Sequence, residues 1–216
     1  MTDLLSNPWS ALPELILRIP ALLLAVTFHE VAHGWVADRL GDPTARRAGR
    51  LTLNPLPHID PIGALAFVLM GFGWAKPVPV NPYNFRHPVR DNVWVAAAGP
   101  AANVVVATAS LIGLVLLLRF GPSAFWSQPI GGILLLSYRF NLILAIFNLI
   151  PLPPLDGSHV LKGFLPRRQL IAFERLEPVG PFLLILLVFT GAIGAILLPV
   201  YAVVDGQIRW LIGWLL

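Results

Sequence analysis

The sequence predicts an all-α polytopic membrane protein, with about four full transmembrane helices and a re-entrant segment or short β-strand. The first observation is composition, because 56% of the 216 residues are hydrophobic and only 12% are charged, which is unusually apolar for a soluble domain. The second is length, because several apolar runs approach or exceed the roughly 20 residues that cross a hydrocarbon core. The third is charge, because Lys and Arg collect in a few connecting loops, as they do in loops that face the cytoplasm.

The first expected span covers residues 13–38, and its length and almost unbroken apolarity predict a helix. Pro13 is tolerated near the start of a helix, whereas Pro20 predicts a kink. Several arginines follow this span, so its C-terminal end is expected on the cytoplasmic side of the membrane.

Residues 62–80 are expected to form a re-entrant segment after the first span. Their apolar part, residues 62–73, is about a dozen residues long, which is short for a full crossing. The part that follows, residues 74–80, contains two prolines and is typical of an extended edge strand. The chain is therefore expected to enter and leave the membrane on the same face.

Three further spans are expected over residues 92–118, 130–150 and 178–200. The short apolar tail, residues 207–216, is expected to form an interfacial or additional helix. The loop before the second span has seven Lys or Arg, the loop after it has one, and the loop after the third span has four. This bias places the two basic loops on the cytoplasmic face. No repeat or separable soluble domain is evident, so we expect one domain over residues 1–216.

One turn of the first span carries the pattern His29, Glu30, His33. Two histidines four residues apart share one face of a helix, so both imidazoles can reach one metal ion. Glu30 stands beside them and can take a proton from a metal-bound water, as in H-E-x-x-H hydrolases. The alternative is a polar helix end at the interface, but polar groups in an apolar segment are costly unless they have a use.

A third metal ligand must come from elsewhere in the chain, and we choose Asp156. The sequence has no cysteine, so a zinc ion must be held by His and carboxylate. Asp156 follows a proline-broken helix end, where irregular backbone is tolerated at membrane depth only if it is buried or lines a wet cavity. Gly157 beside it permits a tight turn. Taken alone Asp156 would be a turn residue, and the histidine pair favours the ligand role.

Two other polar sites have competing interpretations. Asn148 could offer its amide to an oxyanion or to an extended substrate backbone, or it could cap a broken helix. His58 and Asp60 form a second His-x-Asp pair, which could supply an alternative ligand. A turn that Asp60 stabilises before Pro61 is the favoured interpretation of that pair.

These motifs together resemble the site-2 protease family of intramembrane zinc metalloproteases, in its short bacterial type without a PDZ or CBS domain. The matching motifs are His29-Glu30-x-x-His33, Gly99-Pro100-x-x-Asn103 and Asn148-x-x-Pro151-x-x-x-Leu155-Asp156-Gly157. They span most of the chain in the order of the family. We interpret the small and amide residues of the second motif as packing residues, in preference to a direct catalytic role.

The resemblance implies a core of three helices that holds one zinc ion through His29, His33 and Asp156. Glu30 would be the general base, and the enzyme would cleave a transmembrane-helix substrate within the bilayer. Asn148 and the zinc would then stabilise the oxyanion. We expect the protein in the cell membrane, with the active site toward the cytoplasmic side.

The family also pairs a re-entrant strand with the unwound substrate, and the run from Gly71 to Pro77 is similar to that strand. Gly73, Trp74 and Ala75 are therefore the expected substrate-binding residues. Strand addition to such a segment would hold an unwound helix open.

Two other functions are weighed against this one. A non-proteolytic zinc-binding scaffold that recognises transmembrane helices would not need Glu30, which is present. A metal transporter would need polar residues along a continuous path, and the spans offer few beyond the motifs. The net charge of +4 needs no nucleic-acid partner, because basic residues of membrane proteins collect in loops. The identity of the substrate and the oligomeric state are not predicted.

Overall fold

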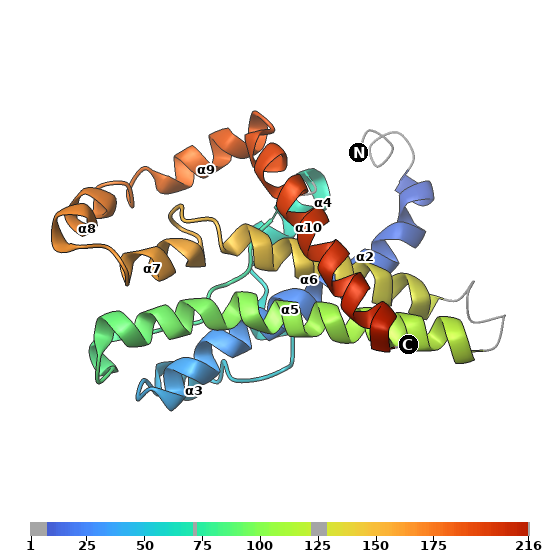
Figure 1. The fold of residues 1–216 in the computed structure, drawn as a ribbon, viewed down its shortest axis with the longest axis horizontal. Helices are drawn as coiled ribbons and strands as arrows, with labels where there is room; N and C mark the ends of the chain where they lie inside the picture. The colour runs from blue at the N-terminus through green and yellow to red at the C-terminus, as the bar shows by residue number, and fades with distance from the viewer. Residues whose placement is uncertain (1–7, 71–72, 122–128, 216) are drawn as a thin grey trace.

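The computed structural model describes residues 8–70, 73–121 and 129–215, which form helices joined by loops, with no β-sheet in these ranges. Four of the described helices are long and apolar enough to cross a membrane. They are α2 (Pro8–Arg39), α5 (Pro88–Phe120), α6 (Pro129–Asn148) and α10 (Ala192–Leu215) (Figure 1). The prediction of an all-α polytopic membrane protein is therefore confirmed.

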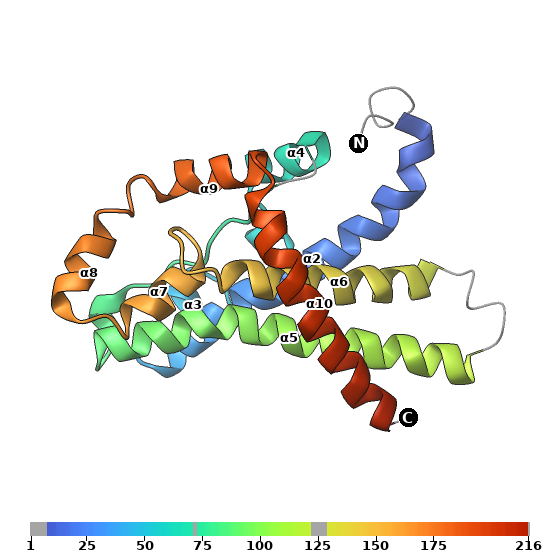
Figure 2. The same ribbon diagram turned by 45° about the horizontal axis from the view of Figure 1, so that its top comes forward.

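Helices α2, α5 and α6 form the core of the bundle. Their mutual contacts are the most extensive between helices of the described chain. Helices α5 and α6 run side by side in both views (Figure 1, Figure 2). Small side chains allow α2 to approach them, since Ala21, Ala25 and Ala37 are fully buried. Such close packing, together with interhelical hydrogen bonds, holds helices together where lipid removes the hydrophobic drive between them.

The C-terminal part of the chain corrects the span expected over residues 178–200. This run forms two helices, because α9 (Gly180–Phe189) ends before Gly191 and α10 begins after it. Gly191 has a φ of +76°, a left-handed conformation that interrupts a right-handed helix. The membrane-length helix is therefore α10, which includes most of the expected tail. The uninterrupted apolar composition of residues 178–200 concealed this break.

The two charged residues of α10, Asp205 and Arg209, are paired with each other, with Arg209 exposed. The carboxylate of Asp205 accepts hydrogen bonds from the hydroxyl of Tyr138 on α6 and from Nε of Arg209 at 2.9 Å. Ile208 and Ile212 belong to one buried cluster with residues of α5 and α6. A membrane-length helix tolerates these charges because they satisfy one another.

The connection between α2 and α5 folds back on itself. Its short helices are α3 (Thr44–Arg47), η1 (Leu56–His58), α4 (Pro61–Met70) and η2 (Pro82–Asn84). A Cβ atom on Gly63 in α4 would collide with the backbone of Trp74, so the chain that leaves α4 returns beside it. This reversal agrees with the expected re-entrant segment, of which positions 71 and 72 lie outside the described residues.

The extended segment, residues 74–80, forms less β-structure than expected. One antiparallel bridge joins Ile59 to Ala75, and the N–H of Lys76 donates to the carbonyl of His58 at 2.9 Å. The N–H of Val78, two residues after Lys76, donates to the side chain of Glu30 at 2.7 Å and does not extend this ladder. The expected short strand is therefore a single bridge in an extended chain.

After α6 the chain turns sharply into α7 (Asp156–Lys162), which packs against α5. A Cβ atom on Gly157 would collide with the carbonyl oxygen of Leu149, so the end of α6 touches the first turn of α7. Helix α8 (Arg167–Glu174) then leads into α9. Helices α3, α7 and α8 lie at one end of the molecule in both views (Figure 1, Figure 2).

Asp42 joins the two ends of the connection between α2 and α5. Its buried carboxylate accepts hydrogen bonds from the backbone N–H of Asn81 and the side-chain amide of Asn84, both at 2.7 Å. It also accepts from the backbone N–H of Thr44 at 3.1 Å and from the hydroxyl of Thr44. Burial alone would raise the pKa of Asp42, but these donors outweigh it and hold the pKa below its usual range.

Replacing Asp42 with alanine should lower the free energy of unfolding at neutral pH by about 2 kcal/mol or more, because buried donors lose a charged acceptor. The difference in the free energy of unfolding between this variant and the wild type should shrink as the pH falls through the low pKa of the folded Asp42 carboxyl. The protonated carboxyl accepts fewer hydrogen bonds. Thermal unfolding in detergent measures both effects. The exposed Glu174→Ala serves as a control, and equal unfolding temperatures for the two variants would contradict the assignment.

Candidate metal centre

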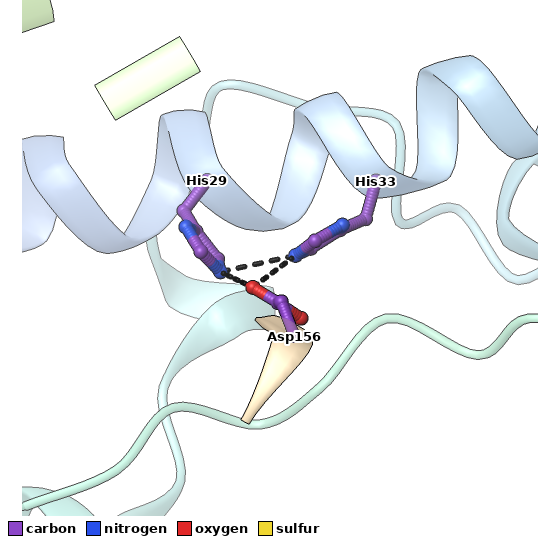
Figure 3. Close-up of side chains that lie close together, drawn as sticks. All are labelled: His29, His33 and Asp156. Carbon is purple, nitrogen blue, oxygen red and sulfur yellow. Dashed lines mark hydrogen bonds and ion pairs between the residues drawn. The ribbon is translucent and has the colours of Figure 1, made fainter. Parts of the chain in front are cut away.

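His29, His33 and Asp156 converge on one point between α2 and the start of α7 (Figure 3). The Nε2 atoms of the two histidines are 3.0 Å apart. Oδ2 of Asp156 lies 3.1 Å from Nε2 of His29 and 3.3 Å from Nε2 of His33. Both histidines are buried, and Asp156 is half-buried. The structure thus brings together the three residues that the sequence predicts as ligands.

The hydrogen bond on the far side of the His33 ring determines where its proton lies. Nδ1 of His33 is 2.7 Å from the carbonyl oxygen of Val95. A carbonyl oxygen only accepts, so Nδ1 must carry the proton. In its neutral form, His33 therefore presents an unprotonated Nε2 to Asp156.

The proton of His29 is placed by a longer chain of hydrogen bonds. Nδ1 of His29 is 2.6 Å from Oδ1 of Asn103 on α5. The amide nitrogen of Asn103 donates to the carbonyl of Ala25 at 2.9 Å and to Oδ1 of Asn141 on α6 at 2.7 Å. Because the nitrogen of Asn103 is committed to these acceptors, its oxygen faces His29 and accepts from Nδ1. In the neutral ring, the Nε2 of His29 is thus also the unprotonated nitrogen.

With both imidazoles neutral, as metal binding requires, three electron-pair donors point at one another. Oδ2 of Asp156 is buried and has no hydrogen-bond donor among the described residues. Such an arrangement is unfavourable unless a cation lies between the donors. Two histidines and a carboxylate are a donor set of zinc enzymes, which keep the fourth position for water. The residues present fit a zinc ion.

Helix α5 lies directly over both imidazoles at Gly99. A Cβ atom there would collide with Nε2 of His33 and would lie 2.6 Å from Cε1 of His29. A glycine is therefore required for α5 to approach the centre this closely. Asn103, one turn further along α5, is fully buried and orients His29.

Glu30 faces the extended segment. Its Oε2 accepts a hydrogen bond from the backbone N–H of Val78 at 2.7 Å, and both residues are buried. The side chain of Val78 also packs at Gly34, one turn after Glu30, where a Cβ atom would lie 3.0 Å from Val78 Cγ1. The extended segment therefore crosses α2 beside the two histidines.

Asn148 is the last residue of α6, and its amide nitrogen donates to the carbonyl of Leu144 at 3.0 Å, within the same helix. No described contact joins Asn148 to the three ligands. His159, on α7, lies with Nδ1 3.5 Å from the amide nitrogen of Asn92 on α5. Burial, reinforced by the charge of Lys162, lowers the pKa of His159 and favours its neutral form.

His58 and Asp60 lie outside the cluster of three ligands. The ring of His58 is buried, and its Nε2 donates to the carbonyl of Thr52 at 2.9 Å. Oδ1 of Asp60 accepts from the backbone N–H groups of Ile62 and Gly63, both at 2.9 Å, at the start of α4. Asp60 therefore has the turn role that the sequence favours.

Sequence analysis did not assign the contact between Asn103 and His29, because the second motif was interpreted as packing residues. The spacing of Gly99 and Asn103 could have indicated it, since residues four apart share a helix face. A buried amide in an apolar span is also costly unless it is satisfied. Val95 could not have been identified, because it contributes a backbone carbonyl that any residue carries.

Comparison with known proteins agrees with a zinc centre. The profile of peptidase family M50 matches residues 121–190. The chain is 37% identical over 200 residues to YwhC of Bacillus subtilis, which is named as a candidate zinc metalloprotease, and the match covers 92% of this chain and 90% of YwhC. Rip2 of Mycolicibacterium smegmatis is 31% identical, and the match covers 87% of this chain and 72% of Rip2. MJ0611 of Methanocaldococcus jannaschii is 30% identical, and the match covers 73% of this chain and 75% of MJ0611. Both are named in the same way. No solved structure matches significantly.

The purified protein should contain about one zinc ion per chain, and Asp156→Ala should lose it or bind it far more weakly, because two histidines remain. Elemental analysis of the protein in detergent measures the zinc content. Asp60→Ala is the matched control, because this carboxylate lies at the start of α4 and should not affect zinc. Zinc retained without Asp156 but lost without Asp60 would overturn the assignment of the third ligand.

Asn103→Leu should weaken zinc binding by about 10- to 100-fold, because His29 loses the acceptor that fixes its tautomer. Competition with a chromophoric chelator measures the dissociation constant. Asn148→Leu makes the same change at the end of α6 and should leave zinc affinity unchanged. An equal loss in both variants would show that Asn103 acts through general packing alone.

Proposed function

Because the chain belongs to peptidase family M50, the site-2 protease family, we propose that it is an intramembrane zinc metalloprotease that cuts within or near transmembrane helices of other membrane proteins. The supporting observation is the position of the ligands. His29 and His33 lie on a helix long and apolar enough to cross a membrane, and α5 covers them. A centre built on such a helix is suited to substrates that are themselves in the bilayer. We assign residues 1–216 to one metalloprotease domain.

Zinc held by His29, His33 and Asp156 would supply Lewis-acid chemistry, which acidifies water and polarises a carbonyl. Glu30 is the proposed general base. The N–H of Val78 holds Oε2 of Glu30, so Oε1 is the oxygen that takes a proton from the attacking water. That proton passes to the nitrogen of the leaving amine as the peptide C–N bond breaks, and the oxygen of the water enters the new carboxyl group.

Asn148 is the proposed donor to the oxyanion. One hydrogen of its amide is used by Leu144, and the second is available to a negative oxygen on the substrate carbonyl. The next residue, Leu149, touches Gly157, the neighbour of Asp156. The end of α6 is thus close to the ligand-bearing turn, which supports this role.

The extended segment, together with Gly73 just before it, is the proposed substrate-binding edge, and Trp74 and Ala75 are the first residues of the segment. A helical substrate hides its carbonyls in hydrogen bonds, so it must unwind and can then be held by strand addition. Lys76 bonds to His58 on one edge of the segment. Backbone groups alternate in direction along an extended chain, so the N–H and C=O of Ala75 point toward the opposite edge.

The proposed location is the cell membrane, with the active site toward the cytoplasm. Arg46 and Arg47 of α3, and Arg167 and Arg168 of α8, lie on helices at one end of the molecule (Figure 2). Basic residues collect on the cytoplasmic face of a membrane protein. The ligand-bearing first turn of α7 belongs to this same end.

Glu30→Gln should keep zinc and lower cleavage of a transmembrane substrate by at least about 100-fold, because the general base is lost. The assay uses proteoliposomes and a panel of single-span fusion proteins, with cut products detected by mass spectrometry. The exposed Glu174→Gln is the matched control and should cleave normally. Undiminished cleavage by Glu30→Gln would end the proposed mechanism. Binding of the panel without any cleavage by the wild type would favour a zinc-dependent scaffold.

A further inference from the structure

We propose that Arg50 is a positioning residue for Glu30 and acts through the peptide group between Pro77 and Val78. The inference rests on the proposed function of Glu30 as the general base. Arg50 lies in the loop after α3 and is only 7% exposed, although it carries a charge. None of the three zinc ligands contacts this buried cation in the described structure.

Arg50 donates to two consecutive carbonyl groups of the extended segment. Its Nη2 is 2.6 Å from the carbonyl oxygen of Lys76, and its Nη1 is 3.2 Å from the carbonyl oxygen of Pro77. The rigid fork of a guanidinium suits two acceptors held side by side, whereas a lysine ammonium offers only a point charge. Arg50 therefore fixes both the position and the orientation of the backbone at these residues.

The same peptide group connects Arg50 to Glu30. Its carbonyl, on Pro77, accepts from Arg50, and its N–H, on Val78, donates to Oε2 of Glu30 at 2.7 Å. The dipole of this peptide group is thus aligned between a cation and a carboxylate, which favours both charges. The described ion pairs include no carboxylate bonded directly to Arg50. Glu30 is therefore its counterpart through one peptide group.

His58 also contacts the Arg50 guanidinium. Nε2 of His58 donates to the carbonyl of Thr52, so Nδ1 is an acceptor and lies 3.5 Å from Nη2 of Arg50. The carbonyl of His58 accepts from Lys76, which ties it to the extended segment as well. Arg50 thus occupies the junction of three stretches of the loop. This accounts for the second His-x-Asp pair without any role in metal binding.

This arrangement has a consequence for catalysis. The peptide group between Pro77 and Val78 holds Oε2 of Glu30. The position of Oε1, which takes the proton, therefore depends on the position of this peptide group. A displacement of about 1 Å at a catalytic group can lower the rate about 100-fold. Loss of Arg50 should therefore impair the chemical step while leaving the zinc ligands in place.

The first test compares Arg50→Gln and Arg50→Lys with Arg47→Gln, an exposed arginine of α3. The probe is a fluorogenic transmembrane peptide that the wild type cleaves. Arg50→Gln should keep about one zinc per chain and lower kcat about 10- to 100-fold with KM changed less than about twofold. Arg50→Lys should lie between Arg50→Gln and the wild type, and Arg47→Gln should be normal. Loss of zinc from Arg50→Gln, or an effect confined to KM, would overturn the proposal.

The second test removes the N–H that links the peptide group to Glu30. Val78→Pro lacks this N–H, whereas the control Val78→Ala keeps it. If Arg50 acts through this group, the double variant Arg50→Gln, Val78→Pro should have about the same kcat as the less active of the two single variants. If the fold-reduction in kcat of the double variant equals the product of the two single fold-reductions, the residues act independently, and the proposal is overturned.

A third measurement does not depend on catalysis. Pro77 and Pro79 have no amide hydrogen, so hydrogen exchange of residues 76–79 reports on Lys76 and Val78. Arg50→Gln should speed exchange there at least about tenfold in the zinc-loaded protein, and Arg47→Gln should not. Unchanged exchange would overturn the inference. Absence of any cleavage by the wild type would instead overturn the proposed function and leave the exchange result valid.

Discussion

The hydrogen bond between Asn103 and His29 is the interaction on which the metal centre depends. It selects the tautomer of the neutral His29 ring in which Nε2 can bind a metal, and the same amide of Asn103 bonds to α2 and α6. One side chain thus sets the packing of three helices and the chemistry of one ligand. In a bundle that gains little from apolar contact between helices, such interhelical bonds stabilise the arrangement, so the fold and the ligand geometry cannot vary separately.

Three parts of the chain contribute residues to the centre. The bundle contributes the histidines on α2, and the turn after α6 contributes Asp156. The loop between α2 and α5 contributes the groups that surround Glu30, since Val78 bonds to its carboxylate. The loop is itself held by two buried charges, since Asp42 joins its two ends and Arg50 joins the residues after α3 to the extended segment. Irregular backbone can lie beside a membrane-length helix because these side chains satisfy its polar groups.

Predictions from the sequence succeeded where the signal was local. Apolar runs identified the helices α2, α5 and α6, and the four-residue spacing placed His29 and His33 on one face. They were wrong for residues 178–200, because composition alone does not reveal that Gly191 adopts a left-handed conformation. They overstated the strand after α4, where the N–H of Val78 bonds to the side chain of Glu30 and not to a neighbouring strand.

The sequence by itself therefore determined the helices that can cross a membrane and the residue types able to bind zinc. Helical periodicity and hydrophobic length act over a few turns, so both can be read from neighbouring residues. Only the tertiary structure decided that Asn103, 74 residues from His29, orients that ligand, and that Arg50 and Glu30 bond to opposite ends of one peptide group. These contacts depend on how loops and helices pack, and no local spacing encodes them.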